Sequence, residues 1–268
     1  MAEKKEKKII SADTKQEISK EEIEAKRKEN YKEAKPVGNA KSKRIAAIIL
    51  WIVAIAMEVL AVLVLNGKGV HFMSQLTQLI VAIVLDLACI IIGSQFWKQA
   101  NHIDPASEAN KVKFWLWNNM GVIVCTIAFV PIIILMLTNK ELDKKTKAIA
   151  TVVAIIALLI GGVSSYDFNP ISEEQLGAAV ETLGDEQVYW SPFGHVYHTH
   201  DDCQSLNQSE QLTVGTVDQA IAENRTRLCA FCAKQDGITG VATDDNDKSA
   251  IEDSDKDTAD EAGEDLGE

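Results

Sequence analysis

The sequence predicts an all-α membrane domain of four transmembrane helices, followed by a small α+β module and flanked by charged tails. Four long apolar runs fall within residues 45–166, and short strand-like and helix-like segments follow them. The 268 residues carry a net charge of −12, but the charge is uneven. Residues 1–44 hold 14 Lys and Arg against 9 Asp and Glu, whereas residues 235–268 hold 2 against 13. This pattern excludes a collagen-like or wholly disordered chain and argues against a single soluble globule.

The apolar runs define the predicted spans, which are residues 45–65, 76–97, 114–137 and 148–166. The first has 21 residues with one charged side chain, and the last two have no charged side chain. About 20 apolar residues are enough for a helix to cross the hydrocarbon core of a bilayer. Buried helices of a soluble protein would each need a polar face, and the last two runs have none. The sequence therefore predicts a multi-pass membrane protein embedded in a lipid bilayer.

Two acidic residues lie inside the predicted spans, Glu58 in the first and Asp86 in the second. An ionisable group at mid-membrane costs about 2.5 to 3.5 kcal/mol on insertion scales, so each should face protein or water rather than lipid. One interpretation is an intramembrane cation or proton site, with Asn118, Asn119 or His102 nearby. The other is a pair of hydrogen-bonded packing residues near the membrane interfaces. Both remain open at the level of sequence.

The distribution of basic residues sets the expected orientation. With the N-terminus in the cytoplasm, eight Lys and Arg near the spans lie inside and five lie outside. This excess of basic residues on the inner side favours both termini in the cytoplasm under the positive-inside rule. If the run containing Asp86 did not fully cross the membrane, the C-terminal module would instead lie outside.

The segments outside the spans divide into two tails and a linker. Residues 1–44 are predicted to be a basic, largely disordered tail that can rest on anionic headgroups, because they contain few apolar anchors. Residues 167–184 are predicted to be a linker, and residues 235–268 an acidic disordered tail. The acidic tail opposes nucleic-acid binding. A protein partner could bind the tails or the module between them, residues 185–234.

Three of the five cysteines occur together with histidines in residues 185–234. His198 precedes Cys203 with four residues between them, and Cys229 and Cys232 form a Cys-x2-Cys pair. Three thiolates and one imidazole make a complete tetrahedral ligand set for Zn(II), and closed sets of this kind are usually structural. His200 is the alternative to His198. His195 is a weaker candidate because it lies nearer to a turn.

The surrounding sequence predicts a small fold that delivers these ligands. Residues 187–190 and 195–198 flank Ser-Pro-Phe-Gly and read as a β-hairpin. Residues 216–219 (TVDQ) are a capping box that opens a helix over 217–224. About fifty residues cannot bury a large core, so a bound metal would supply folding free energy.

Three other interpretations of the cluster are open. A Cys229–Cys232 disulfide with Cys203 free would fit a module outside the cell. A zinc hydrolase with Asp201 or Asp202 as the base would need an open coordination position. A redox role for the Cys-x2-Cys pair lacks a thioredoxin-like βαβ setting.

The segment YWSPFGHVYHTHDDCQSL, with GTVDQAIAENRTRLCAFC after it, resembles a short zinc-binding module found at the ends of many bacterial proteins. That module is related in pattern to the metal-binding domain of the Ada DNA-repair protein. The resemblance covers about fifty residues and implies His198, Cys203, Cys229 and Cys232 as the ligands. A histidine replaces one of the four Ada cysteines, and no methyl-accepting or DNA-reading domain is present, so the repair function does not transfer.

The whole chain is also similar to uncharacterised multi-pass membrane proteins of Gram-positive bacteria, through WKQANHIDPASE and FVPIIILMLTNKELDKKTKAIA. This likeness implies no activity. We therefore expect a non-enzymatic membrane protein with a structural zinc module for interaction or sensing. The alternative is a small ion or metal transporter or channel that uses Glu58 and Asp86 and is regulated by the module.

Overall fold

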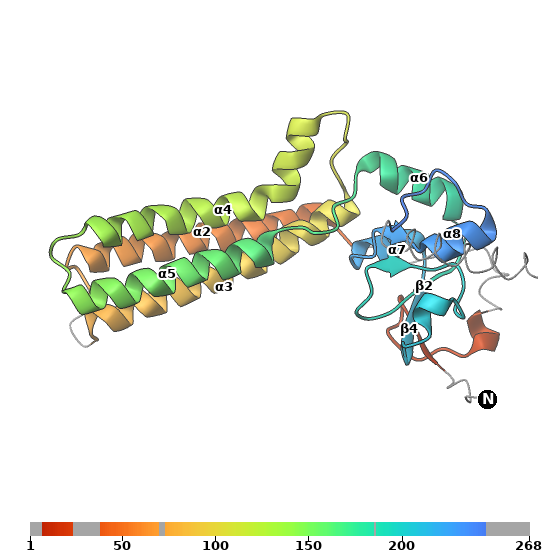
Figure 1. Cartoon of the computed structure of the whole chain (residues 1–268), viewed down its shortest axis with the longest axis horizontal. Coiled ribbons are helices and arrows are strands. Elements are labelled where there is room, and N and C mark those ends of the chain that lie inside the picture. Colours follow the sequence, from red (N-terminus) through yellow and green to blue (C-terminus); the bar gives the residue numbers. More distant parts are fainter. Residues whose placement is uncertain (1–6, 24–37, 70–72, 185, 245–268) are drawn as a thin grey trace, which may run out of the picture. The chain divides into compact units, whose positions relative to one another are not determined.

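The computed structural model describes residues 7–23, 38–69, 73–184 and 186–244 (Figure 1). The chain divides into two compact units. The helical unit is Asn39–Pro170. The mixed unit combines the N-terminal segment, up to Gly38, with the chain from Ile171 onward.

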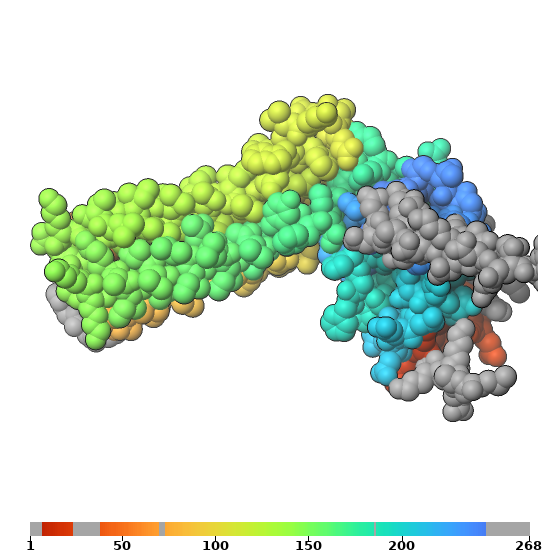
Figure 2. Space-filling model, in the orientation of Figure 1, coloured from red at the N-terminus to blue at the C-terminus, as the bar shows by residue number. Residues whose placement is uncertain are grey.

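Four long helices form the helical unit and lie side by side in one elongated bundle (Figures 1 and 2). They are α2 (Ala40–Leu65), α3 (Gln75–Ile103), α4 (Lys111–Thr138) and α5 (Lys144–Ser165). At 1.5 Å per residue, even the 22 residues of α5 extend about 33 Å, enough to cross a bilayer core. Only 22% to 33% of each apolar window is buried inside the bundle. The remaining Ile, Leu and Val side chains face outward, as expected for helices surrounded by lipid.

Each of these helices begins at a polar capping residue. Asn39, Ser74, Asn110 and Asp143 accept hydrogen bonds from backbone N–H groups of the first helical turn. Such caps satisfy donors that have no partner within the helix. Each predicted span thus lies in a helix that is long and apolar enough to cross a membrane, and the capped polar ends make the helices longer than the apolar runs.

Small residues and aromatic rings determine how the helices pack. A Cβ atom added at Gly93 of α3 would lie 2.8 Å from Nε1 of Trp51, so glycine lets α2 approach closely. Trp97 lies between Trp51 and Trp117, with its ring tilted against both and ring centroids 5.2 and 5.7 Å apart. The indole of Trp97 also donates a hydrogen bond of 2.8 Å to the carbonyl of Trp117. Trp97 and Trp117 thus meet at one end of the bundle, as expected for interfacial indoles, whereas Trp115 is exposed.

The mixed unit contains two small sheets. In the first, β4 (Gln211–Gly215) lies between β1 (Lys8–Ser11) and β2 (Val188–Trp190), parallel to β1 and antiparallel to β2. In the second, β3 (Val196–Tyr197) pairs in parallel with β5 (Arg227–Leu228). The helices are α6 (Glu173–Leu183), α7 (Val217–Ala222), α8 (Ala230–Asp236) and the 3₁₀ turn η1 (Gln204–Leu206).

The N-terminal segment is part of this sheet, so the expectation of a disordered tail is wrong for residues 7–23. Ile9 pairs with Leu212, and Ile9 and Ile23 pack on Val214. The side chain of Gln187 donates a hydrogen bond of 3.2 Å to the carbonyl of Ile23. Few apolar residues suffice here because a strand distant in sequence supplies the other half of the contact. The rest of the predicted tail, residues 1–6 and 24–37, lies outside the described residues.

The pairing of β1 with β4 also constrains membrane topology. Both strands belong to one sheet, so they lie on the same side of any bilayer crossed by the helices between them. An even number of crossings is then required, and four of the described helices are long and apolar enough to cross. The alternative in which the run containing Asp86 fails to cross is inconsistent with this pairing.

The boundaries of the module extend beyond residues 185–234. α6 occupies most of the predicted linker and begins at a capping box formed by Ser172 and Gln175. At the other end, α8 stops at Gly237, whose φ of 66° is left-handed. The chain then returns to β5, where the N–H of Leu228 donates to Ala242 at 2.9 Å. Residues 235–244 are thus folded, and the remaining acidic stretch, 245–268, lies outside the described residues.

Candidate metal centre

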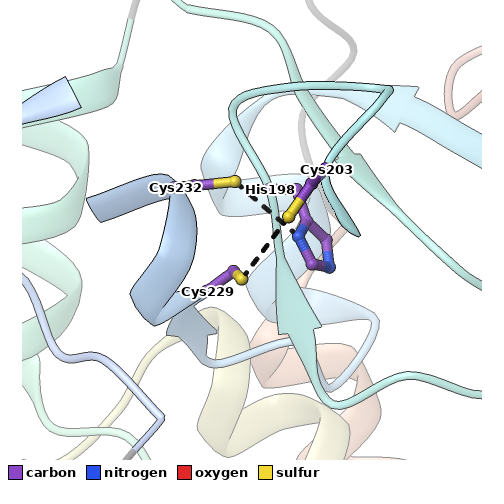
Figure 3. A group of neighbouring side chains, drawn as sticks. All are labelled: His198, Cys203, Cys229 and Cys232. Carbon is purple, nitrogen blue, oxygen red and sulfur yellow. Dashed lines mark hydrogen bonds between the residues drawn. The ribbon is translucent and has the colours of Figure 1, made fainter. Parts of the chain in front are cut away.

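His198 is held by the predicted hairpin. Tyr189 and His198 exchange two backbone hydrogen bonds of 2.7 Å, which brings the end of β3 alongside β2. The ring of His198 is 2% exposed and turns its Nδ1 atom toward the thiols (Figure 3). The predicted pairing of the two arms is confirmed, although β3 itself also joins β5 in the second sheet.

Cys203 lies at the start of η1, five residues after His198. The backbone N–H of Ser205 donates to its sulfur, and Leu206 packs into the core just after it. This tight turn directs the Cys203 thiol back toward His198 (Figure 3).

Cys229 and Cys232 are delivered by the first turn of α8. The N–H of Cys229 donates a hydrogen bond of 2.9 Å to the carbonyl of Tyr197, which fixes β5 beside β3. Cys229 is the N-terminal capping position of α8, and Cys232 follows one turn later on the same face. The capping box predicted for the neighbouring helix α7 is present, with the N–H of Thr216 donating to Gln219 at 3.0 Å.

The four side chains form one buried cluster (Figure 3). Their ligand atoms all lie within 4.8 Å of one another. The sulfurs of Cys203 and Cys229 are 3.8 Å apart, as are the sulfur of Cys232 and Nδ1 of His198. Zn–S bonds of about 2.3 Å in a tetrahedron separate two sulfurs by about 3.8 Å and a sulfur from a nitrogen by about 3.6 Å. The cluster therefore has the size of a tetrahedral metal site, and the group could hold a metal ion.

The electrostatics of the cluster favour a bound cation. Hydrogen bonds from the thiols of Cys203 and Cys229 lower the pKa of Cys232 against the effect of burial, with further donors in the His200 N–H and the Thr199 hydroxyl. The same contacts raise the pKa of Cys203. Sulfurs this close cannot all carry negative charge without a nearby positive charge. A metal cation at their centre removes this conflict.

The alternative ligand His200 points elsewhere. Its Nε2 atom lies 2.7 Å from Oδ1 of Asp236 at the end of α8, and this pair is partly exposed. The hydrogen bond that His200 donates to the Asp236 carboxylate raises the pKa of His200. His195 lies in the exposed part of the hairpin, away from the cluster.

The structure also describes the residues of the disulfide and zinc-hydrolase interpretations. None of the five cysteines, all of which the structure describes, forms a disulfide, so Cys229 and Cys232 are not joined to each other. Asp201, one candidate base, pairs with Lys20 at 2.9 Å, and its carbonyl accepts a hydrogen bond from Lys7. These contacts join the loop before Cys203 to the N-terminal segment.

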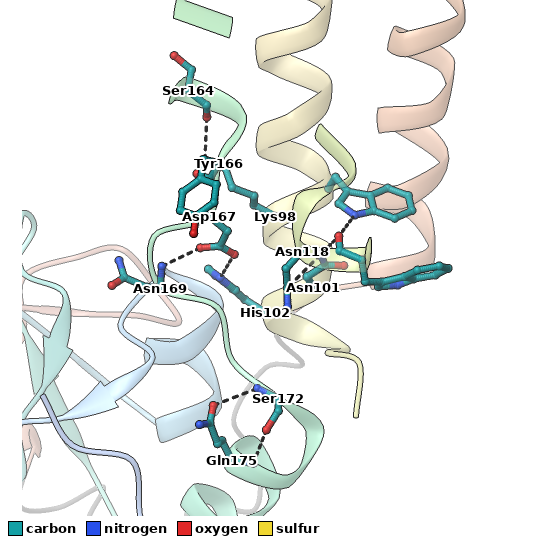
Figure 4. A network of polar contacts seen from close by, with 12 residues as sticks. Lys98, Asn101, His102, Asn118, Ser164, Tyr166, Asp167, Asn169, Ser172 and Gln175 are labelled. Atoms are coloured by element: carbon teal, nitrogen blue, oxygen red, sulfur yellow. Dashed lines mark hydrogen bonds and ion pairs between the residues drawn. The ribbon is translucent and has the colours of Figure 1, made fainter. Parts of the chain in front are cut away.

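The two acidic residues of the predicted spans come together in the helical unit. Glu58 of α2 and Asp86 of α3 line one small cavity. The polar residues suggested as their neighbours lie elsewhere. His102 is at the end of α3, where its Nε2 atom is 2.9 Å from Oδ2 of Asp167, and Asn118 faces Asn101 at 3.5 Å (Figure 4).

Sequence reasoning missed the pair formed by His102 and Asp167. Both side chains are almost fully buried, at 4% and 3% exposure. Burial would raise the pKa of Asp167, but the hydrogen bond and charge of His102 and the N–H of Asn169 keep it below its usual value. Nearby, the ammonium of Lys98 donates to the carbonyl of Ser164 at 2.9 Å (Figure 4). The only signal in the sequence was the position of each residue just beyond an apolar run.

The chain was compared with known protein families, curated proteins and solved structures, and none of them matches it.

Proposed function

We propose that His198, Cys203, Cys229 and Cys232 bind one Zn(II), and that this ion stabilises the C-terminal module of a membrane-embedded protein. The observation that carries the proposal is the mutual distance of the four buried ligand atoms, all within 4.8 Å. A set of three thiolates and one imidazole suits zinc, which prefers four-coordinate sites with sulfur and nitrogen ligands. The same four residues are those implied by the likeness to the Ada-related bacterial module.

The proposed role of the zinc is structural because the site is closed. Four protein ligands complete a tetrahedron and leave no position for a substrate or an activated water. All four ligand residues are buried, which also keeps solvent away from the ion. We therefore assign no catalysis to this centre, and neither Asp201 nor Asp202 has a role as a base.

The ion would connect three short elements of the module, β3, β5 and α8. β3 and β5 each contain two residues, and α8 contains seven. His198 follows β3, and the Cys-x2-Cys pair lies between β5 and the first turn of α8. Small modules with such short elements commonly obtain much of their folding free energy from the metal.

A module that holds a closed metal centre and is anchored to four apolar helices is suited to interaction or sensing at the membrane surface. We place both termini and the module in the cytoplasm, because the basic residues near the spans favour that orientation. The lipid bilayer is the first partner, and a protein partner would bind the module or the tails. The transport alternative is favoured by one observation, the shared cavity of Glu58 and Asp86.

Metal analysis of the full-length protein tests the zinc assignment. The protein is purified in detergent under reducing conditions without added metal, and its metal content is measured by mass spectrometry. We expect one zinc per chain in the wild type and loss of the metal in Cys203→Ser and His198→Ala. The matched controls Cys89→Ser and His200→Ala should retain it, because Cys89 is in α3 and His200 pairs with Asp236.

Two results would contradict the proposal. If wild-type protein contained no metal and material taken from cells had a Cys229–Cys232 disulfide, the two cysteines would form a disulfide instead of binding zinc. If His198→Ala kept its zinc and His200→Ala lost it, the fourth ligand would be His200 and not His198. The full chain is needed because the module includes residues 7–23 and α6, which a fragment beginning at Gly184 would lack.

A further inference from the structure

Asp86 occupies an unusual environment in the helical unit. It lies near the middle of α3 and is only 3% exposed. Its Oδ1 atom is buried and makes no hydrogen bond to any residue that the structure describes. The carboxyl lines a small cavity with Glu58 of α2, and the small side chains of Ala61 and Ala82 are also part of its lining.

No described basic group compensates a negative charge at this position. The titratable groups that interact with Asp86 are the carboxyl of Glu58 on α2, the thiol of Cys89 on α3 itself and the thiol of Cys125 on α4. The apolar part of α5, residues 148–165, contains no ionisable side chain. An ionised carboxylate here would bear the full cost of burial, and two ionised carboxylates in one cavity would also repel each other.

The number of oxygen atoms that line the cavity indicates which cation could bind there. Apart from the two carboxyl groups, the lining consists of aliphatic side chains and the thioether of Met57. Two carboxyl groups provide at most four oxygen atoms, so Ca²⁺ or Mg²⁺, which take six or more oxygen ligands, would need several water molecules in a small cavity whose remaining lining is apolar. A proton requires only one oxygen to bind and a second to accept its hydrogen bond.

We propose that Glu58 and Asp86 form a proton-binding site within the membrane-spanning helices. At neutral pH the site holds a proton on a carboxyl group, and the unpaired Oδ1 of Asp86 takes part in the hydrogen bond between the two acids. This site is independent of the zinc centre and goes beyond the function proposed for the module.

Beyond the buried Ile90, further polar groups occupy the interior of the bundle toward one end. Ser94 and Asn101 follow Asp86 on the same face of α3, at intervals of eight and seven residues. Gly121 of α4 lets Ser94 and Ser165 approach one another, because a Cβ there would lie 2.6 and 3.1 Å from their side chains. The hydroxyl groups of Ser94 and Ser165 and the carbonyl oxygen of Asn101 are buried without a hydrogen bond to another described residue. Buried polar groups of this kind are the usual sites of ordered water, which can carry protons.

Infrared spectroscopy of the full-length protein in lipid vesicles tests this site. The carbonyl stretch of a protonated carboxyl group is separate from the bands of a carboxylate, so a protonated acid can be observed directly. We expect a protonated-carboxyl band at neutral pH that disappears in Asp86→Asn. In Glu58→Gln the band should remain but change in frequency, because its hydrogen-bond partner has changed. The control Asp104→Asn alters an exposed acid that pairs with Arg44 and should leave the band unchanged.

The proposal fails if wild-type protein shows no protonated carboxyl group at neutral pH, or if the band persists in Asp86→Asn and in Glu58→Gln without a change in frequency. Titration with Na⁺ or Mg²⁺ at constant pH gives a separate check. Loss of the band on adding either ion would mean that the site takes a metal cation instead. If Asp86→Asn does not fold, the wild-type spectrum and the Glu58→Gln shift still decide the matter. The zinc content of each variant is measured in parallel, so failure of one proposal is distinguished from failure of the other.

Discussion

The N-terminal strand offers a sharp test of the mixed unit, because two adjacent isoleucines in β1 have different environments. Ile9 is 4% exposed and packs with Ile23 and Val214, whereas Ile10 is only partly buried. Replacing Ile9 with alanine removes three buried carbon atoms. At about 0.8 kcal/mol each, their loss destabilises this part of the sheet by about 2.4 kcal/mol. Ile10→Ala should cost less than about 1 kcal/mol, since its side chain gives up less buried area.

Hydrogen exchange of the full-length protein, read by mass spectrometry, measures this difference. Under conditions in which exchange reports the local opening equilibrium, 2.4 kcal/mol corresponds to about 50-fold faster exchange of the amides in β1 and β4. Ile10→Ala should accelerate exchange there by less than about fivefold. Peptides from α4 and α5 serve as internal controls. Equal exchange in β4 for wild type and Ile9→Ala would show that residues 7–23 are not an integral part of the mixed unit.

Two further predictions concern the helical unit. The pKa of Asp167 is lowered in the folded protein, so the stability that it contributes is complete above its usual value of about 4 and is lost as pH falls through the lower folded value. The unfolding temperature should therefore fall more steeply from pH 7 to pH 3 in wild type than in Asp167→Asn. At pH 7 the variant should be less stable by about 1 to 3 kcal/mol, because the charged acceptor of the His102 hydrogen bond is replaced by a neutral one. A parallel slope in the two proteins would count against this role. Gly161→Ala should destabilise the bundle by about 1 to 3 kcal/mol, because the new Cβ would lie 2.7 Å from the sulfur of Cys125, whereas Gly162→Ala meets nothing within 4 Å and should be tolerated. Comparable unfolding temperatures for the two glycine variants would refute the close contact.

The candidate metal centre could be predicted in part from local sequence patterns. The Cys-x2-Cys spacing places Cys229 and Cys232 on one turn, and the hairpin pattern places His198 at the end of a strand, so each half of the site could be predicted on its own. The sequence favoured His198 and kept His200 as the alternative, because the direction of each side chain is not contained in the spacing. In the structure, Asp236 at the end of α8 engages His200, while His198 turns toward the thiols.

The sequence by itself determined the four apolar helices and the composition of the ligand cluster. Both depend on properties of short segments: the length of an apolar run, a capping residue before it, and the spacing of cysteines within one turn. Only the tertiary structure decided that β1 joins β4, that His102 meets Asp167 and that Glu58 shares a cavity with Asp86. These partners are separated by many residues, and β1 lies about two hundred residues before β4. Such contacts arise from the packing of whole elements, and the periodicity of one segment carries no information about which distant segment will cover it.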